Sequence, residues 1–256
     1  QSLLCAKLAA RLNAYLEKGG RVLLTGCSGL NFDKTAFMLD VGAEYDGVSE
    51  YTPDYMIPNF DAVNGRTEYV MYSAGQKLKN VTGTVLAYRQ KPYFNRGPFH
   101  FSSHQHTPND VSAPKTPAAV VKGNIAYIGW NIFEDYANKG ELVDRELVLK
   151  AVDCLLGDER TVRTTLPDHG VVTVTRQGSR HVVHLLFAHT TVRGKKTEVI
   201  EDAVPVMNVP VSLRLPEAPR KVYLAPEETP IPFEWDGARV TFTVPQVLLH
   251  QMVVCE

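Results

Sequence analysis

Apolar residues recur with two different periods in the first part of the chain. Leucines at every fourth position of residues 3–17, and a similar stripe along 141–156, predict two amphipathic helices, and a short helix is expected at 33–40. Between them lie short apolar runs that predict buried strands, at 22–25, 67–72, 83–89, 118–121 and 124–129. Buried strands that alternate with amphipathic helices favour an α/β layered domain with a largely parallel sheet.

The pattern changes after Gly157, where the helical period ends. Short runs of alternating apolar and polar residues follow, with turn signals such as Gln177-Gly178 and Asp236-Gly237 between them. Seven or more strands at this spacing are typical of a β-sandwich. We therefore expect two domains, at residues 1–157 and 160–256.

Composition excludes some classes of partner. The 256 residues are 44% hydrophobic and 21% charged, with a formal net charge of −1. This composition is typical of a soluble globular protein, and it is compatible with a cytoplasmic, periplasmic or secreted location. The charge provides no basic field for nucleic acid, and no apolar run approaches the ~20 residues that cross a bilayer. The four cysteines show neither zinc-site nor disulfide-framework spacing, so no metal and no cofactor are expected.

The turn Gly26-Cys27-Ser28-Gly29 resembles a nucleophile elbow because it joins a buried strand to a helix-like segment. An elbow has one residue between the nucleophile and each flanking glycine, whereas here neither Cys27 nor Ser28 has both glycines in place. A tight structural turn is the favoured interpretation. Catalysis by Cys27 with His104 or His106 remains the alternative.

The segment 92–110, "PYFNRGPFHFSSHQHTPND", concentrates histidines and aromatic residues. In an extended chain His104 and His106 point the same way, about 6.5–7 Å apart, which suits two ligands of one metal, and Asp110 follows them, but no third ligand stands at a diagnostic spacing. Rings and polar donors in this segment also suit contact with a carbohydrate or with another subunit. An ordered surface loop is the remaining interpretation. The residues expected to contact substrate are Tyr93, Asn95, Arg96, His104 and His106.

Several segments resemble a known family. Four segments are similar to the β-galactosidase trimerisation domain of family-42 glycoside hydrolases: "GGRVLLTGCSGLNFDKTAFMLDVGAEYDG", "YTPDYMIP", "PYFNR...SHQHTP" and "GNIAYIGWNIFEDY". The second part of the chain is similar to the β-sandwich tail of related hydrolases. The resemblance implies a flavodoxin-like, class I amidotransferase-like three-layer α/β/α domain, N-terminally incomplete here. It also implies an upstream (β/α)₈ barrel that carries both catalytic glutamates, a homo-trimer, and a 93–106 loop that reaches a neighbouring barrel.

The sequence therefore supports a non-catalytic accessory and oligomerisation region of a β-galactosidase-like glycoside hydrolase, without catalytic residues of its own. Its expected partners are the barrel of the same polypeptide and a carbohydrate substrate. Two alternatives stay open. One is a free-standing amidotransferase-like or thiol hydrolase that uses Cys27 with His104 or His106, and the other is a carbohydrate-binding module.

Overall fold

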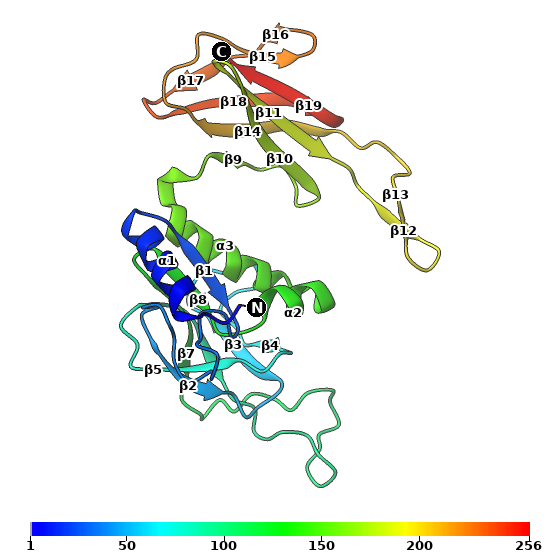
Figure 1. Cartoon of the computed structure of the whole chain (residues 1–256). Coiled ribbons are helices and arrows are strands. Elements are labelled where there is room, and N and C mark those ends of the chain that lie inside the picture. Colours follow the sequence, from blue (N-terminus) through cyan, green and yellow to red (C-terminus); the bar gives the residue numbers. More distant parts are fainter. Residues whose placement is uncertain (1) are drawn as a thin grey trace. The chain divides into compact units, whose positions relative to one another are not determined.

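The chain folds into two compact units, which are described separately below. A computed structural model describes residues 2–256. Unit 1 is Gln1–Gly157 and unit 2 is Asp158–Glu256 (Figure 1). None of the helices among the described residues combines the length and the apolar character needed to span a lipid bilayer.

Unit 1 is built around a six-stranded sheet with the strand order β1-β8-β7-β6-β3-β4. Only β1 and β8 pair in parallel, and the other four pairings in this sheet are antiparallel. The strands are β1 (Val22–Thr25), β3 (Asp54–Pro58), β4 (Tyr69–Met71), β6 (Thr84–Gln90), β7 (Thr116–Lys122) and β8 (Ile125–Ile128).

Both faces of this sheet are buried, because successive side chains of a strand point to opposite faces. In β8, Ala126 and Ile128 belong to one core, whereas Ile125 and Tyr127 belong to the other. The first core is closed by helices α2 (Ile132–Lys139) and α3 (Leu142–Leu156). The second is closed by helix α1 (Ala6–Glu17), and Leu78 from the two-stranded sheet of β2 (Glu44–Val48) and β5 (Gln76–Lys79) joins it.

The prediction of a flavodoxin-like three-layer α/β/α domain is wrong. A flavodoxin-like sheet is parallel and needs a crossover helix between successive strands. Among residues 2–256 there are three α-helices, and none lies between β1 and β8 in sequence. Residues Gly123 and Asn124 join β7 directly to β8, as an antiparallel hairpin permits. The unit is therefore mainly β, with antiparallel pairing.

The short helix expected at 33–40 is also absent. The side chain of Asn31 explains this difference, since its Oδ1 accepts hydrogen bonds from the backbone N–H groups of Thr35 (2.8 Å) and Ala36 (3.3 Å). An amide that binds these donors offers the backbone an alternative to a helix. Lys34 adopts a positive φ of 52°, so the segment is a turn.

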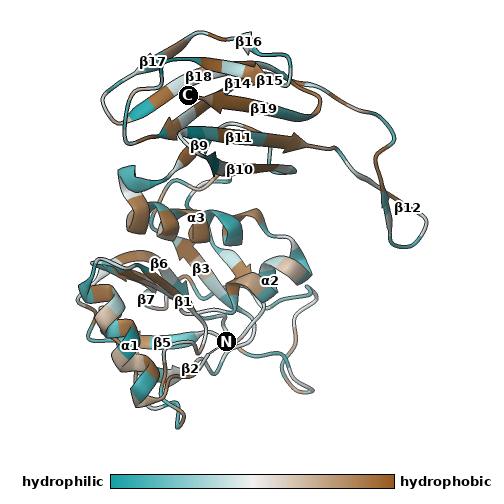
Figure 2. Ribbon diagram, turned by 45° about the horizontal axis from the view of Figure 1, so that its top comes forward, coloured by the Kyte–Doolittle hydropathy of each residue, from teal (hydrophilic) through white to brown (hydrophobic). Residues whose placement is uncertain are grey.

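Unit 2 is a β-sandwich, as its alternating pattern predicts. Val183 and Leu185 from one sheet and Val211, Leu213 and Phe242 from the other belong to one buried cluster. Figure 2 shows hydrophobic and hydrophilic residues along the same strands, which is the pattern of sheets with one buried face. One sheet has the order β10-β11-β19-β15-β16 and the other β17-β18-β14-β9. Their bounds are β9 (Val162–Thr164), β10 (Gly170–Gln177), β11 (Arg180–Phe187), β14 (Val206–Arg214), β15 (Val222–Ala225), β16 (Thr229–Pro230), β17 (Phe233–Trp235), β18 (Arg239–Val247) and β19 (Leu249–Cys255).

A separate hairpin of β12 (Thr191–Arg193) and β13 (Thr197–Val199) extends from the sandwich (Figure 1). Arg193 of β12 forms an ion pair with Glu201, which follows β13, and Arg193 Nε lies 2.6 Å from the Glu201 carboxylate. A short 3₁₀ helix, Gly157–Glu159, follows α3 where the two units are joined in sequence.

Candidate functional site

The segment between β6 and β7 forms a loop whose two ends lie together. The backbone N–H of Asp110 donates to Lys91 O at 2.8 Å, and that of Tyr93 donates to Pro108 O at 3.1 Å. Below, the hydroxyl of Tyr55 in β3 donates to Thr107 O at 2.6 Å. We call residues 91–110 the aromatic loop. These contacts close its base, as in an Ω-loop, and present its middle on the surface.

Two of the expected substrate-contact residues instead hold the aromatic loop in place. Asn95 Nδ2 donates to Glu50 O at 2.6 Å, and Asn95 Oδ1 accepts from the N–H of Thr52 at 3.2 Å. Arg96 Nη1 donates to Gln105 O at 2.6 Å, across the loop. The Asn95 amide therefore has both its nitrogen and its oxygen engaged, and its first role is to fix the loop against the segment before β3.

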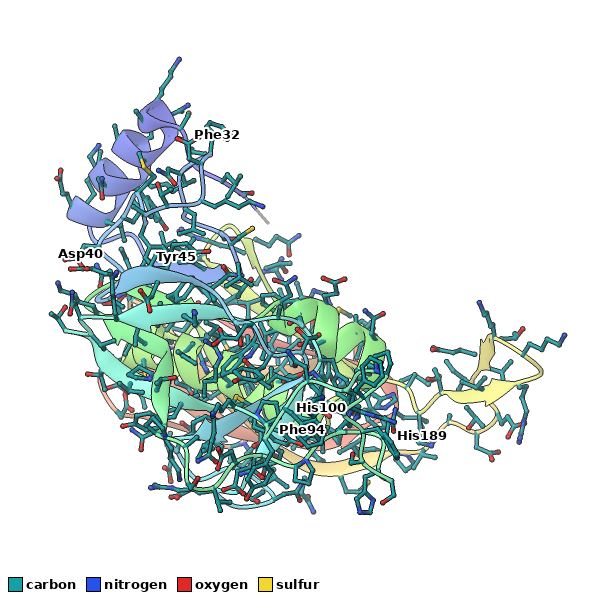
Figure 3. The ribbon with its side chains drawn as sticks, turned by 90° about the horizontal axis from the view of Figure 1, so that it is seen from below. Phe32, Asp40, Tyr45, Phe94, His100 and His189 are labelled. Atoms are coloured by element: carbon teal, nitrogen blue, oxygen red, sulfur yellow. The ribbon has the colours of Figure 1, made fainter. Side chains whose placement is uncertain are left out.

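The aromatic rings of this loop are largely exposed. Phe99 is 91% exposed, Phe101 75% and Tyr93 54%. Phe94 and His100 pack side by side, with ring centroids 5.9 Å apart (Figure 3). A single exposed aromatic residue is ordinary, but three exposed aromatic side chains on one anchored loop make that loop a candidate interaction site.

The structure places His104 and His106 in different surroundings. His104 is exposed, whereas the ring of His106 lies edge-on against Tyr72, which follows β4, at a centroid distance of 5.3 Å. Asp110, which follows the two histidines in sequence, accepts from Ser112 Oγ at 2.6 Å, and this bond lowers the pKa of Asp110. Within residues 2–256, no group of three or more His, Cys, Asp or Glu side chains is arranged to hold a metal ion.

A small hollow of about 90 Å³ lies against the loop. Thr52, Phe94 and Arg96 are among the residues that line it. Sites that enclose a drug-sized ligand measure roughly 300–1,000 Å³, so this hollow cannot enclose a whole sugar ring. The loop is suited to contact from outside, by another protein surface or by one part of a saccharide.

A buried ion pair lies in the sheet that carries the loop, and no local sequence pattern indicates it. Arg89 Nε in β6 lies 2.6 Å from Asp54 Oδ2 in β3, with the two side chains 6% and 0% exposed. Trp130 Nε1 donates to Asp54 Oδ1 at 2.8 Å, and Arg89 Nη2 donates to Gln76 O at 2.9 Å. Gly75 makes this packing possible, because a Cβ there would lie 2.1 Å from Arg89 Nη2. Burial raises the pKa of Asp54 to about 6, although the nearby Arg89 charge acts to lower it.

The thiol site of the alternative hypothesis is separated from its histidines. Cys27 lies in the turn after β1, at one edge of the sheet. His106 contacts Tyr72, just after β4, which is the opposite edge strand. The two residues therefore belong to opposite edge strands, and nothing among residues 2–256 brings the Cys27 thiol together with the His106 ring.

Replacing Asn95 by alanine should release the aromatic loop without unfolding unit 1. Since both bonds of this side chain join exposed segments, the effect on global stability should stay below about 1 kcal/mol. Chymotrypsin should cleave at Phe99 or Phe101 about tenfold faster, measured by mass spectrometry of timed digests. Asn31→Ala, which removes a similar amide from another loop, is the matched control. Equal cleavage rates in the wild type and Asn95→Ala would show that Asn95 does not hold the loop.

Comparisons with known proteins give a result for structure but not for sequence families. No protein-family model matches the sequence, and no curated protein matches it. Among solved structures, α-L-fucosidase isoenzyme 2 from Paenibacillus thiaminolyticus matches with a TM-score of 0.95 and 43% identity. The match covers 100% of this chain and 39% of the fucosidase. The chain thus spans well under half the length of that enzyme.

More distant likenesses concern the fold alone. A catalytic mutant of Gan42B, a GH42 β-galactosidase from G. stearothermophilus, matches with a TM-score of 0.51 and 14% identity, over 99% of this chain and 30% of that one. A second structure of Gan42B gives the same TM-score, 0.51, with 13% identity, over 98% of this chain and 30% of that one. The expected link to family-42 enzymes is thus supported at the level of fold, whereas the specific trimerisation domain is not. Together, the comparisons support a region related to glycoside hydrolases.

Proposed function

We propose that this chain is a non-catalytic accessory region of a glycoside hydrolase that acts on α-L-fucosides, and that the catalytic carboxylates lie on another domain. The observation that carries the proposal is the likeness to the fucosidase, at 43% identity over the whole chain. It favours a fucoside over the galactoside expected from the sequence, because the β-galactosidase likeness is only 13–14% in identity.

The aromatic loop is the part that we propose to contact the catalytic domain beside its substrate cleft. Tyr55 and Asn95 fix the base of the loop. Binding a partner would therefore order the exposed rings with little further loss of conformational entropy. Phe99 and Phe101 supply apolar area, while His104 and the remaining guanidinium nitrogens of Arg96 supply donors for hydroxyl groups. The resemblance to a trimerisation domain extends the proposal to a homo-trimer, in which the loop of one protomer would reach its neighbour.

A chimera tests this function. This chain would replace the matched region of the Paenibacillus thiaminolyticus fucosidase, and hydrolysis of 4-nitrophenyl α-L-fucoside would be measured. The isolated 256-residue chain should show no turnover, and the chimera should be active. Phe99→Ser with Phe101→Ser should lower kcat/KM of the chimera at least tenfold, which corresponds to about 1.4 kcal/mol of lost transition-state stabilisation.

Phe32→Ser is the matched control, since Phe32 is also exposed, at 66%, but lies across unit 1 from Phe94 and His100 (Figure 3). It should leave kcat/KM unchanged. Turnover by the isolated chain would sink the accessory role, and a chimera indifferent to the loop substitutions would sink the proposed contact. Millimolar binding of L-fucose to the isolated chain, lost on Tyr93→Ala, would instead favour a carbohydrate-binding module.

A further inference from the structure

Three carboxylates meet where helices α2 and α3 join, next to Tyr72. Asp135, in the first turn of α2, accepts from Ser73 N at 3.1 Å and from Ser73 Oγ at 2.7 Å. Glu141 precedes α3 and accepts a hydrogen bond from the Tyr72 hydroxyl. Asp144, in the first turn of α3, is 1% exposed, and neither of its carboxylate oxygens has a hydrogen-bond partner among the described residues. We call these three side chains the acidic cluster.

Asp144 does not act as a helix cap. The N-terminus of α3 has no side-chain capping hydrogen bond, and its N-cap residue is Glu141. A carboxylate near a helix N-terminus benefits from the helix dipole, but it normally also binds a free backbone N–H. Asp144 binds none, although a buried carboxylate without a partner costs several kcal/mol. The side chain is therefore poised for a donor that these residues do not supply.

Among residues 2–256, no lysine or arginine side chain bonds to the Asp144 carboxylate. Lys139 Nζ lies 4.4 Å from the centroid of the Tyr72 ring, on an exposed side chain, and makes no ion pair with Asp144. Glu141 and Asp144 are three positions apart at the start of α3, so their side chains lie on neighbouring positions of one helix face. One Glu141 oxygen, Oε2, is also buried without a partner. Within the described part of the chain, the acidic cluster thus contains three buried oxygen atoms without a partner, Asp144 Oδ1 and Oδ2 and Glu141 Oε2.

The shape of these acceptors favours an organic cation over a metal ion. The cluster is not among groups of side chains spaced to hold a metal, since residues 2–256 contain none. A guanidinium group offers five N–H donors in a plane, and its two-pronged edge matches carboxylate oxygens. Arginine is also less strongly hydrated than lysine, so its transfer from water to a buried carboxylate costs less.

We infer that the acidic cluster receives one arginine side chain of the catalytic domain, with Asp144 and the free oxygen of Glu141 as its acceptors. The inference rests on the proposed function, because that function supplies the partner domain. The fucosidase has most of its chain outside the region that matches this one. The contact would lie beside the aromatic loop, because Tyr72 bonds to Glu141 on one side and packs against His106 on the other. Two independent features, apolar rings and an unpaired acid, would then meet the same partner.

An arginine peptide tests the inference on the 256-residue chain alone. Acetyl-Gly-Arg-Gly-amide would be titrated at pH 9, where Asp144 is ionised, and the melting temperature followed by circular dichroism. Binding to the folded chain at ten times Kd should raise the melting temperature by about 3 °C. The citrulline peptide, which has the same shape without the charge, should give no shift.

Variants identify the acceptors. Asp144→Asn and Glu141→Gln should each abolish the shift, whereas Lys139→Ala should increase it because a competing cation is removed. Equal shifts with the arginine and citrulline peptides, or an undiminished shift in Asp144→Asn, would overturn the inference. If the arginine peptide does not raise the melting temperature while the loop substitutions still inactivate the chimera, the proposed arginine contact is wrong and the proposed function stands. If the peptide binds but the loop substitutions have no effect, the proposed loop contact falls instead.

Discussion

Asp54→Ala is expected to lower the free energy of unfolding of unit 1 by about 3–5 kcal/mol, because it leaves the Arg89 guanidinium buried without its counter-charge. Arg89 Nε lies 2.6 Å from Asp54 Oδ2, and both side chains are almost fully excluded from solvent. Asp54 also accepts a hydrogen bond from Trp130 Nε1, so removing the carboxylate would leave the indole N–H without an acceptor as well. Urea unfolding followed by tryptophan fluorescence measures the change.

The exposed ion pair of Asp61 and Arg66 provides the matched control. Its atoms lie 3.0 Å apart, similar to the buried pair, but the two side chains are 95% and 57% exposed. Asp61→Ala should cost less than about 1 kcal/mol, because water replaces the lost partner. Similar losses in the two variants would show that burial does not determine the importance of the Asp54–Arg89 pair.

The sequence predicted elements of the fold better than their arrangement. The periodicities at 3–17 and 141–156 correspond to α1 and α3, and the alternation after Gly157 correctly predicted a sandwich. Short apolar runs such as 118–121 and 124–129 show burial on both faces, but burial is the same whether strands run parallel or antiparallel. The direction of β7 and β8 is set by the Gly123-Asn124 turn, which was not identified as a hairpin. Missing this hairpin accounts for one antiparallel pairing, and the pairings of β6 with β7 and of β3 with β6 and β4 were not visible in the local pattern either.

The composition of the sequence identified the loop as a candidate site, but no pattern in the sequence predicted the contacts within the loop. Aromatic residues and histidines between prolines identified the 92–110 segment correctly as an unusual surface loop. The roles of Asn95 and Arg96 depend on partners far away in sequence or across the loop, so no local pattern shows that they anchor it. Asp135 lies in the first turn of α2, but it is only 6% exposed. A carboxylate at a helix start is ordinary, and only the packing of Tyr72 and Ser73 around it reveals the acidic cluster.

The acidic cluster has a consequence for the stability of the free chain. Burial, reinforced by the charges of Glu141 and Asp135, raises the pKa of Asp144 to about 8. The value in an unfolded chain is about 3.9, so the folded state binds an extra proton between these two values. The contribution of Asp144 to stability is therefore fully present below about pH 4 and is lost as the pH rises to about 8. A cation from a partner would replace this proton at neutral and alkaline pH.

Asp144→Asn should remove this dependence and stabilise the isolated chain at high pH. The amide has the shape of the protonated acid and never ionises, so the variant should match the wild type at pH 4 and exceed it by about 3–5 kcal/mol at pH 9. Urea unfolding at pH 4, 6, 8 and 9 gives the difference between the two proteins, in which the titration of distant groups such as Asp54 cancels. Asp153→Asn, an exposed position of the same helix, should show no such growth with pH. A wild type that is as stable as Asp144→Asn at pH 9 would mean that Asp144 already has a partner in the free chain, and the need for a cation from outside would disappear with it.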